Sequence, residues 1–273
     1  MSIEINKFYA EICDLTRLHR LITPLGSTSA ELTIVVSNDG LRFVSENGPL
    51  LQTIIYYNSR NILKLEKNGG TSFIMIKIPT NDFLNTLKGC GYTDTVAKLS
   101  YNEEINGENL RVVIDETITK ATFNIHATPT ITTTMFKEKM NTIVQVCTLV
   151  SKPFSHSIQY VSEFTDEVKI VVSPEGIYFY SFSDGSTFDC SILTKGENIL
   201  EVTSSFVDTY WYTSKSLRKL LPYLNLSKFC KIKISRNGTL EFKIEFNDSE
   251  ISVNSVQIWI AGINDPTSDG KVN

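Results

Sequence analysis

Residues 32–45 read LTIVVSNDGLRFVS, and residues 168–181 read VKIVVSPEGIYFYS. Seven of these fourteen positions are identical, and the two stretches lie 168 − 32 = 136 residues apart in a chain of 273. Each stretch is a pair of apolar-rich runs around a turn that contains glycine, which is the pattern of a β-hairpin. A repeat at about half the chain length predicts that one folding unit is built twice.

The composition bounds the class of protein. Apolar residues make up 41% of the chain and charged residues 21%, as in ordinary soluble globular proteins. No run approaches the ~20 apolar residues that a membrane span needs, and no secretory signal opens the chain. The five cysteines lack C-x-x-C spacing, so we expect reduced thiols in the cytosol or nucleus. The net charge of −4 argues against bulk electrostatic coating of nucleic acid, but not against a local basic surface.

Each half shows alternating strands and two short amphipathic segments, which predicts an α+β fold of two similar domains with antiparallel sheets. The first domain is expected at 1–127, an uncharged connector at 128–134, the second domain at 135–263 and a polar tail at 264–273. The four helices are predicted at 14–22, 81–87, 137–149 and 214–223.

Catalytic constellations are not visible in the sequence. The three histidines are far apart, and there is no nucleotide-binding glycine motif. Two-metal nuclease chemistry needs clustered carboxylates, and the one D-x-[DE] pair, Asp248 and Glu250, is interpreted as a solvated turn. The sequence therefore predicts no enzyme, no catalytic residue, no metal and no cofactor.

Basic residues gather on the predicted helices, away from their apolar stripes. Singly, each helix is typical of a solvated surface, but the arrangement recurs in a chain that is acidic overall. Such basic faces fit a protein that contacts the phosphate backbone of DNA without recognising the base sequence. The predicted DNA-facing residues are Arg17, Arg20, Lys88, Lys137, Lys139, Lys215, Arg218 and Lys219.

The duplicated unit resembles the eukaryotic sliding-clamp fold, of which proliferating cell nuclear antigen is the best-known member. Within that superfamily, residues 21–27 (LITPLGS), 39–47 (DGLRFVSEN) and 171–179 (VVSPEGIYF) are most similar to the checkpoint (nine-one-one) clamp and its Rad-one type of subunit. The resemblance covers essentially residues 5–263.

The resemblance implies a function and partners. It implies one subunit of a heterotrimeric ring that encircles double-stranded DNA at damage sites, is loaded by an ATP-dependent clamp loader, and docks checkpoint and repair proteins in the nucleus. Strands around 110–116 and 187–193 are then expected to be the edges that pair with neighbouring subunits. The expected interface residues are Leu110, Arg111, Val112, Val113, Ile114, Thr187, Phe188, Asp189, Cys190, Ser191 and Ile192.

Three alternatives remain open at this point. The chain could be another clamp subunit, including a replicative clamp that serves as a polymerase processivity factor. A 3'-5' exonuclease is the alternative from another class, against which the missing carboxylate cluster speaks. A scaffold without DNA contact is the third, and only the charges on the helices argue against it.

Overall fold

A computed structural model describes residues 7–68, 71–88, 95–102, 104, 107–116, 119–131, 140, 142–183, 185–204, 209–247 and 253–263. The chain divides into two compact units. The first comprises Met1–Asn47, Thr53–Thr134 and Asn247–Ser255, and the second comprises Gly48–Gln52, Met135–Phe246 and Val256–Asn273.

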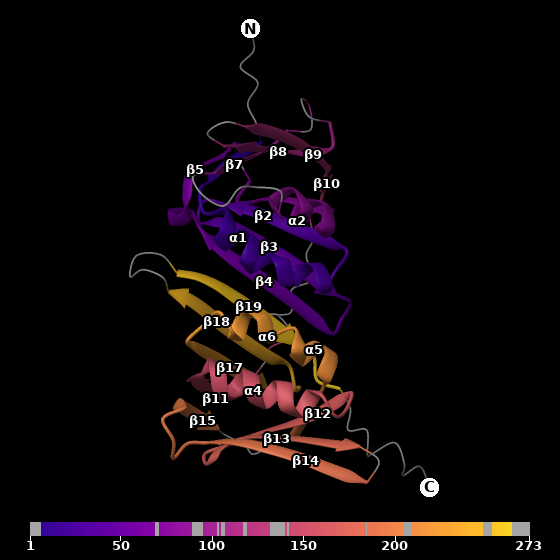
Figure 1. Ribbon diagram of the computed structural model, residues 1–273, viewed down its shortest axis with the longest axis vertical. Helices are drawn as coiled ribbons and strands as arrows, with labels where there is room; N and C mark the ends of the chain where they lie inside the picture. The colour runs from indigo at the N-terminus through magenta and orange to yellow at the C-terminus, as the bar shows by residue number, and fades with distance from the viewer. Residues whose placement is uncertain are drawn as a thin grey trace. The chain divides into compact units, whose positions relative to one another are not determined.

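The first unit holds two helices against one face of a sheet (Figure 1). One of its sheets has the strand order β10-β6-β2-β3-β4 and the other has the order β5-β1-β7-β8-β9. The strands are β1 (Phe8–Ile12), β2 (Glu31–Ser37), β3 (Gly40–Asn47), β4 (Leu51–Asn58), β5 (Ile62–Lys67), β6 (Ile74–Pro79), β7 (Val96–Tyr101), β8 (Asn109–Asp115), β9 (Lys120–His126) and β10 (Thr128–Pro129). The helices are α1 (Leu15–Ile22), followed by the 3-10 turn η1 (Thr23–Ser27), and α2 (Thr80–Lys88); a second 3-10 turn, η2 (Ser59–Asn61), follows β4.

Local sequence explains how the first unit is built. The carboxylate of Asp14 accepts a hydrogen bond of 2.9 Å from the Arg17 N–H and so caps the start of α1. Leu18 and Ile22 of that helix are completely buried. In the same core, the ring of Phe43 on β3 stacks on Phe83 of α2 with centroids 6.1 Å apart. The apolar face of each helix therefore covers the sheet, and the opposite face is left to solvent.

The second unit repeats this plan of strands and helices. The strand orders are β19-β18-β17-β11-β15 and β14-β13-β12-β16. The strands are β11 (Ile143–Val150), β12 (Glu167–Ser173), β13 (Gly176–Ser183), β14 (Ser186–Leu193), β15 (Ile199–Ser204), β16 (Thr209–Thr213), β17 (Phe229–Ser235), β18 (Leu240–Asn247) and β19 (Val253–Ile260). The helices are α4 (Ser151–Ser162), α5 (Ser214–Arg218) and α6 (Leu221–Leu224).

The predicted helix at 137–149 is wrong. Residues 143–150 form strand β11, which pairs with β15 and β17, and the helix of this part of the chain is α4. The run IVQVCTLV is rich in β-branched residues, which favour a strand, and Pro153 stands in the first turn of α4, where proline is tolerated. The first residues of the predicted connector form β10, which pairs with β6.

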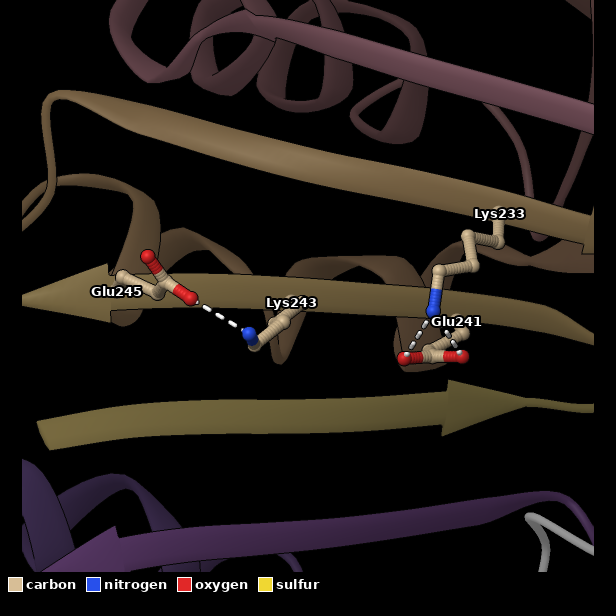
Figure 2. Close-up of polar contacts among 4 residues, drawn as sticks. All are labelled: Lys233, Glu241, Lys243 and Glu245. Carbon is tan, nitrogen blue, oxygen red and sulfur yellow. Dashed lines mark hydrogen bonds and ion pairs between the residues drawn. The ribbon is translucent and has the colours of Figure 1, made fainter.

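The core of the second unit is aromatic on the helix side of its sheets. Phe154 of α4 lies 5.7 Å from Phe179 and 5.6 Å from Phe242, measured between ring centroids. The other face of the β17–β18 hairpin carries charges (Figure 2). There the ammonium of Lys233 lies 3.2 Å from the buried carboxylate of its cross-strand partner Glu241, which compensates the burial of that charge. Among the described residues, no helix is long and apolar enough to span a membrane.

Candidate DNA-facing surfaces and subunit edges

The first unit places three of the predicted basic residues on its two helices. Arg20 and Lys88 are exposed, and Arg17 is half-buried. Burial of the imidazole, and next the positive charge of Lys88, lower the pKa of His19. Helices α1 and α2 contact each other, with His19 in the last turn of α1 and Lys88 in the last turn of α2. Two helix ends thus bring positive side chains to one surface of the unit.

The second unit holds a pair of lysines at α5. Lys215 is exposed, and Lys219 directly follows the helix. Burial, and then the charge of Lys215, lower the pKa of Lys219. Like charges four residues apart repel one another in a helical turn. A phosphate backbone would relieve that repulsion, so the pair suits contact with a polyanion.

Arg218 is exposed, as Lys215 is, but its guanidinium is bonded within the unit. Its Nε donates a hydrogen bond of 3.1 Å to Ser162 Oγ, and its Nη2 donates to the carbonyl oxygen of Ser162. Ser162 is the last residue of α4, where carbonyl groups lack helical partners and attract cations. The guanidinium therefore holds two helices of the same unit together.

The basic residues of the third predicted helix have no place in a described helix. Lys137 and Lys139 lie outside the described residues. The helix that does form, α4, exposes Lys152 in its first turn and His156 in its second. Sequence reasoning missed Lys152, although the 136-residue offset maps the start of α1 at residue 15 onto residue 151.

The first predicted edge strand is wrong. β8 pairs with β7 on one side and with β9 on the other, so its backbone is already occupied. β9 is the terminal strand of that sheet. The residues misassigned to an edge are Leu110, Arg111, Val112, Val113 and Ile114.

The open side of β9 can be assigned from its ladder with β8. The Glu116 N–H donates to the Thr119 carbonyl at 2.9 Å. Hydrogen-bonded pairs alternate along an antiparallel ladder, so the odd-numbered residues of β9 bond to β8. The N–H groups of Thr122 and Asn124 therefore point to the open edge.

The second predicted edge strand, β14, is the terminal strand of its sheet. Thr194 N–H donates to the Glu175 carbonyl at 2.9 Å, and the same alternation directs the even-numbered residues of β14 toward β13. The N–H of Cys190 is thus engaged, whereas those of Asp189 and Ser191 point outward. The interface role of Thr187, Phe188, Asp189, Cys190, Ser191 and Ile192 stays a prediction.

No catalytic arrangement is found in the described part of the chain. No group of three or more His, Cys, Asp or Glu side chains could hold a metal there. Burial raises the pKa of the Cys147 thiol to about 12 and also raises that of Cys230, so neither is an activated nucleophile. Asp248 and Glu250 lie outside the described residues.

Comparison with known proteins now adds the family. A search of curated protein sequences finds no match. Among solved structures, PCNA from Thermococcus kodakaraensis is similar over 94% of this chain and 100% of its own, with a TM-score of 0.74 and 14% sequence identity. That likeness confirms the predicted sliding-clamp fold. The model of the family described as "Repair protein Rad1/Rec1/Rad17" matches residues 7–245. Because this match spans most of the chain, the protein belongs to the Rad1/Rec1/Rad17 family of repair proteins, as its resemblance to the checkpoint clamp predicted.

Proposed function

We propose that this chain is the Rad-one type of subunit of a heterotrimeric checkpoint clamp. The ring encircles duplex DNA at damage sites and is a platform on which checkpoint and repair proteins dock. The observation that carries this function is the family match over residues 7–245 on a chain with the sliding-clamp fold. The same reading implies action in the nucleus and loading by an ATP-dependent clamp loader.

The helix surfaces supply the contact with DNA in this proposal. Each basic side chain contributes a small, sequence-independent interaction by releasing counterions from phosphates. This suits a clamp, which must hold DNA without stopping at particular bases. The residues assigned to this contact are Arg17, Arg20, Lys88, Lys152, Lys215 and Lys219.

Two of the terminal strands, β9 and β14, supply the contacts with the neighbouring subunits. An unpaired strand exposes a row of backbone donors and acceptors that another strand can complete. β9 carries Lys120 and β14 carries Asp189, so charge contributes to the choice of neighbour at each edge.

The chain itself is proposed to have no nuclease activity. Support comes from the lack of a metal-holding group in the described residues and from the presence of a single D-x-[DE] spacing in the sequence, Asp248 and Glu250. Replacing Asp248 and Glu250 by Ala should leave the activity of highly purified protein on 3' ends at background, as in the wild type. A metal-dependent activity that vanishes in this double variant would establish the exonuclease instead.

Topological linkage to DNA tests the clamp function directly. The complex co-purified with its two partner subunits should be loaded onto a circular plasmid by its loader, and the plasmid should then be cut once. A ring that encircles DNA remains bound to the circle at moderate salt and slides off the linear ends. Retention that is equal on circular and linear DNA would contradict the proposal.

A further inference from the structure

Three aromatic side chains gather beside the open edge of β14. Phe164, two residues past the end of α4, stacks on Phe188 of β14 with ring centroids 4.1 Å apart and an interplanar angle of 7°. Tyr160 of α4 meets Phe164 edge-on at 5.4 Å. Tyr160 is 48% exposed and Phe164 is 41% exposed. We call these three residues the aromatic patch. Exposed aromatic side chains in contact with one another are typical of interaction surfaces.

The aromatic patch is continuous with the unpaired backbone of β14. Phe188 belongs to the edge strand itself. The thiol of Cys190, two residues along on the same face, contacts Ser157 Oγ of α4 at 3.1 Å. This side of β14 is thus covered by α4 at Cys190 and by Phe164 at Phe188. A strand that pairs with β14 would pass beside Tyr160 and Phe164 and would lay its α4-side residues on them.

Helix α5 fixes the segment that carries Phe164. Arg218 bonds to Ser162 on one side of this residue. Ser214 bonds to the other side, with its Oγ 2.5 Å from the Thr165 carbonyl and its N–H 2.7 Å from the Asp166 carbonyl. Hydrogen bonds to a charged group are among the stronger ones in proteins. Phe164 is therefore held from both ends by one short helix.

We infer that Arg218 is a positioning residue for subunit assembly and not a DNA contact, and that the aromatic patch receives the neighbouring clamp subunit. The partner is an edge strand that presents apolar side chains on the face it turns toward α4. This inference rests on the proposed function, because it takes β14 as a ring edge. In this inference, the guanidinium of Arg218 links the helices of the second unit to strand β14, the edge at which the neighbouring subunit binds.

The test isolates the β14 edge. In a chain carrying Thr122→Pro, which removes an outward N–H from β9, association with the two partner subunits depends on β14 alone. In this background we expect Arg218→Ala and Phe164→Ala each to weaken association by about tenfold or more. Arg218→Ala should add little in a chain that already carries Phe164→Ala, because both act through the same patch. Lys231→Ala, which removes one positive charge on the far face of β17, is the matched control and should not change association.

Two further measurements separate positioning from other roles. Thermal unfolding of the isolated chain identifies a general loss of stability. If Arg218→Ala folds poorly, Phe164→Ala still tests the aromatic patch, because that variant keeps the hydrogen bonds of Arg218. The salt dependence of DNA binding by assembled rings identifies phosphate contact: loss of one such contact lowers the logarithmic slope by about 0.9. We expect the slope to be unchanged by Arg218→Ala, and a lowered slope would overturn the inference.

Failure of the inference and failure of the proposed edge give different results. In the Thr122→Pro background, Ser191→Pro removes an outward N–H of β14 and should abolish association. If association persists in that chain, β14 is not the ring edge and the proposed edge is wrong. If Ser191→Pro abolishes association while Arg218→Ala and Phe164→Ala associate like the wild type, only the inference is wrong.

Discussion

Gly40 shows how much of this fold depends on one missing side chain. Its φ is +134°, and a Cβ built there would lie 2.2 Å from the Tyr57 carbonyl oxygen and 2.8 Å from the Ser59 nitrogen. Gly48 also has positive φ, +54°, but a Cβ there would meet nothing within 4 Å. The two glycines therefore separate backbone strain from steric clash.

We expect Gly40→Ala to cost at least about 2 kcal/mol of the free energy of unfolding, because strain and clash act together. Gly48→Ala should cost about 1 kcal/mol, since only the left-handed backbone is strained. Urea denaturation of the two variants beside the wild type measures both values. Equal costs would show that the hairpin can shift away from the new methyl group.

The cysteines offer a second test on single side chains. Burial raises the pKa of Cys147 to about 12 and raises that of Cys230 as well, while Cys13 is exposed. At pH 8 only roughly one Cys147 in ten thousand is then a thiolate, which is the reactive form. Iodoacetamide should label Cys13 in the folded chain, and Cys147 and Cys230 only after denaturation, as read by mass spectrometry.

The sign of the pH effect follows from the same pKa values. The raised pKa of Cys147 means that the fold favours the neutral thiol, so this contribution to stability is complete below the ordinary thiol pKa. It is lost as the pH rises from there toward about 12. Replacing Cys147 by Ala should therefore flatten the alkaline loss of stability. A profile as steep as that of the wild type would assign the loss to other groups.

At the level of strands and helices, the repeat predicted more than periodicity did. Apolar spacing alone indicated a helix at 137–149, because Met140, Ile143, Val144 and Cys147 also fit helical spacing. The 136-residue offset maps β1 at residues 8–12 onto 144–148, inside β11, and α1 onto the start of α4. The offset of the duplicated hairpin thus predicts a strand at 144–148 and a helix from 151. The prediction of a helix at 137–149 followed the local apolar spacing instead.

Helix α4 exposes Lys152, which the helix predicted at 137–149 did not include, and this residue gives a prediction. Lys152→Glu should weaken retention of the assembled ring on circular DNA about tenfold at moderate salt, because it removes one phosphate contact and adds a repulsive charge. Lys231→Glu makes the same change in net charge on the face of β17 that is opposite the buried Ile232 and Ile234. That control should leave retention unchanged. Equal losses in both variants would mean that net charge, and not the surface of α4, decides retention.

At the scale of the whole molecule, the sequence did not predict which strand lies at the edge of the first unit's sheet. The resemblance to sliding clamps led to the choice of the strand around 110–116 as an edge, and the charges of Arg111, Asp115 and Glu116 were compatible with that choice. Interior strands are the ones that bury apolar residues, whereas β9 buries only Ile125 among its seven residues. Strand order arises from pairing between distant segments, so it became visible only in the sheet itself.

Ring closure constrains what an edge mutation can do. A ring of three subunits has three interfaces, and breaking one leaves an open chain of three that the other two still hold. A variant altered at a single edge is therefore expected to keep the mass of the trimer while losing topological retention on DNA. A change at both edges of this chain should release it from its partners altogether.

The hydrogen-bond pattern of the β8–β9 and β13–β14 ladders identifies Thr122→Pro and Ser191→Pro as the changes that test the two edges. Each removes an outward N–H of an edge strand and leaves the bonds to β8 or β13 in place, whereas Cys190→Pro would break the β13–β14 ladder. Light scattering of the co-expressed complex should give a trimer for each single variant and a free chain beside a partner dimer for the double variant. Circular dichroism and thermal unfolding should match the wild type for both edge prolines and fall for Cys190→Pro. A double variant that still elutes as an intact trimer would show that subunits join through surfaces other than β9 and β14.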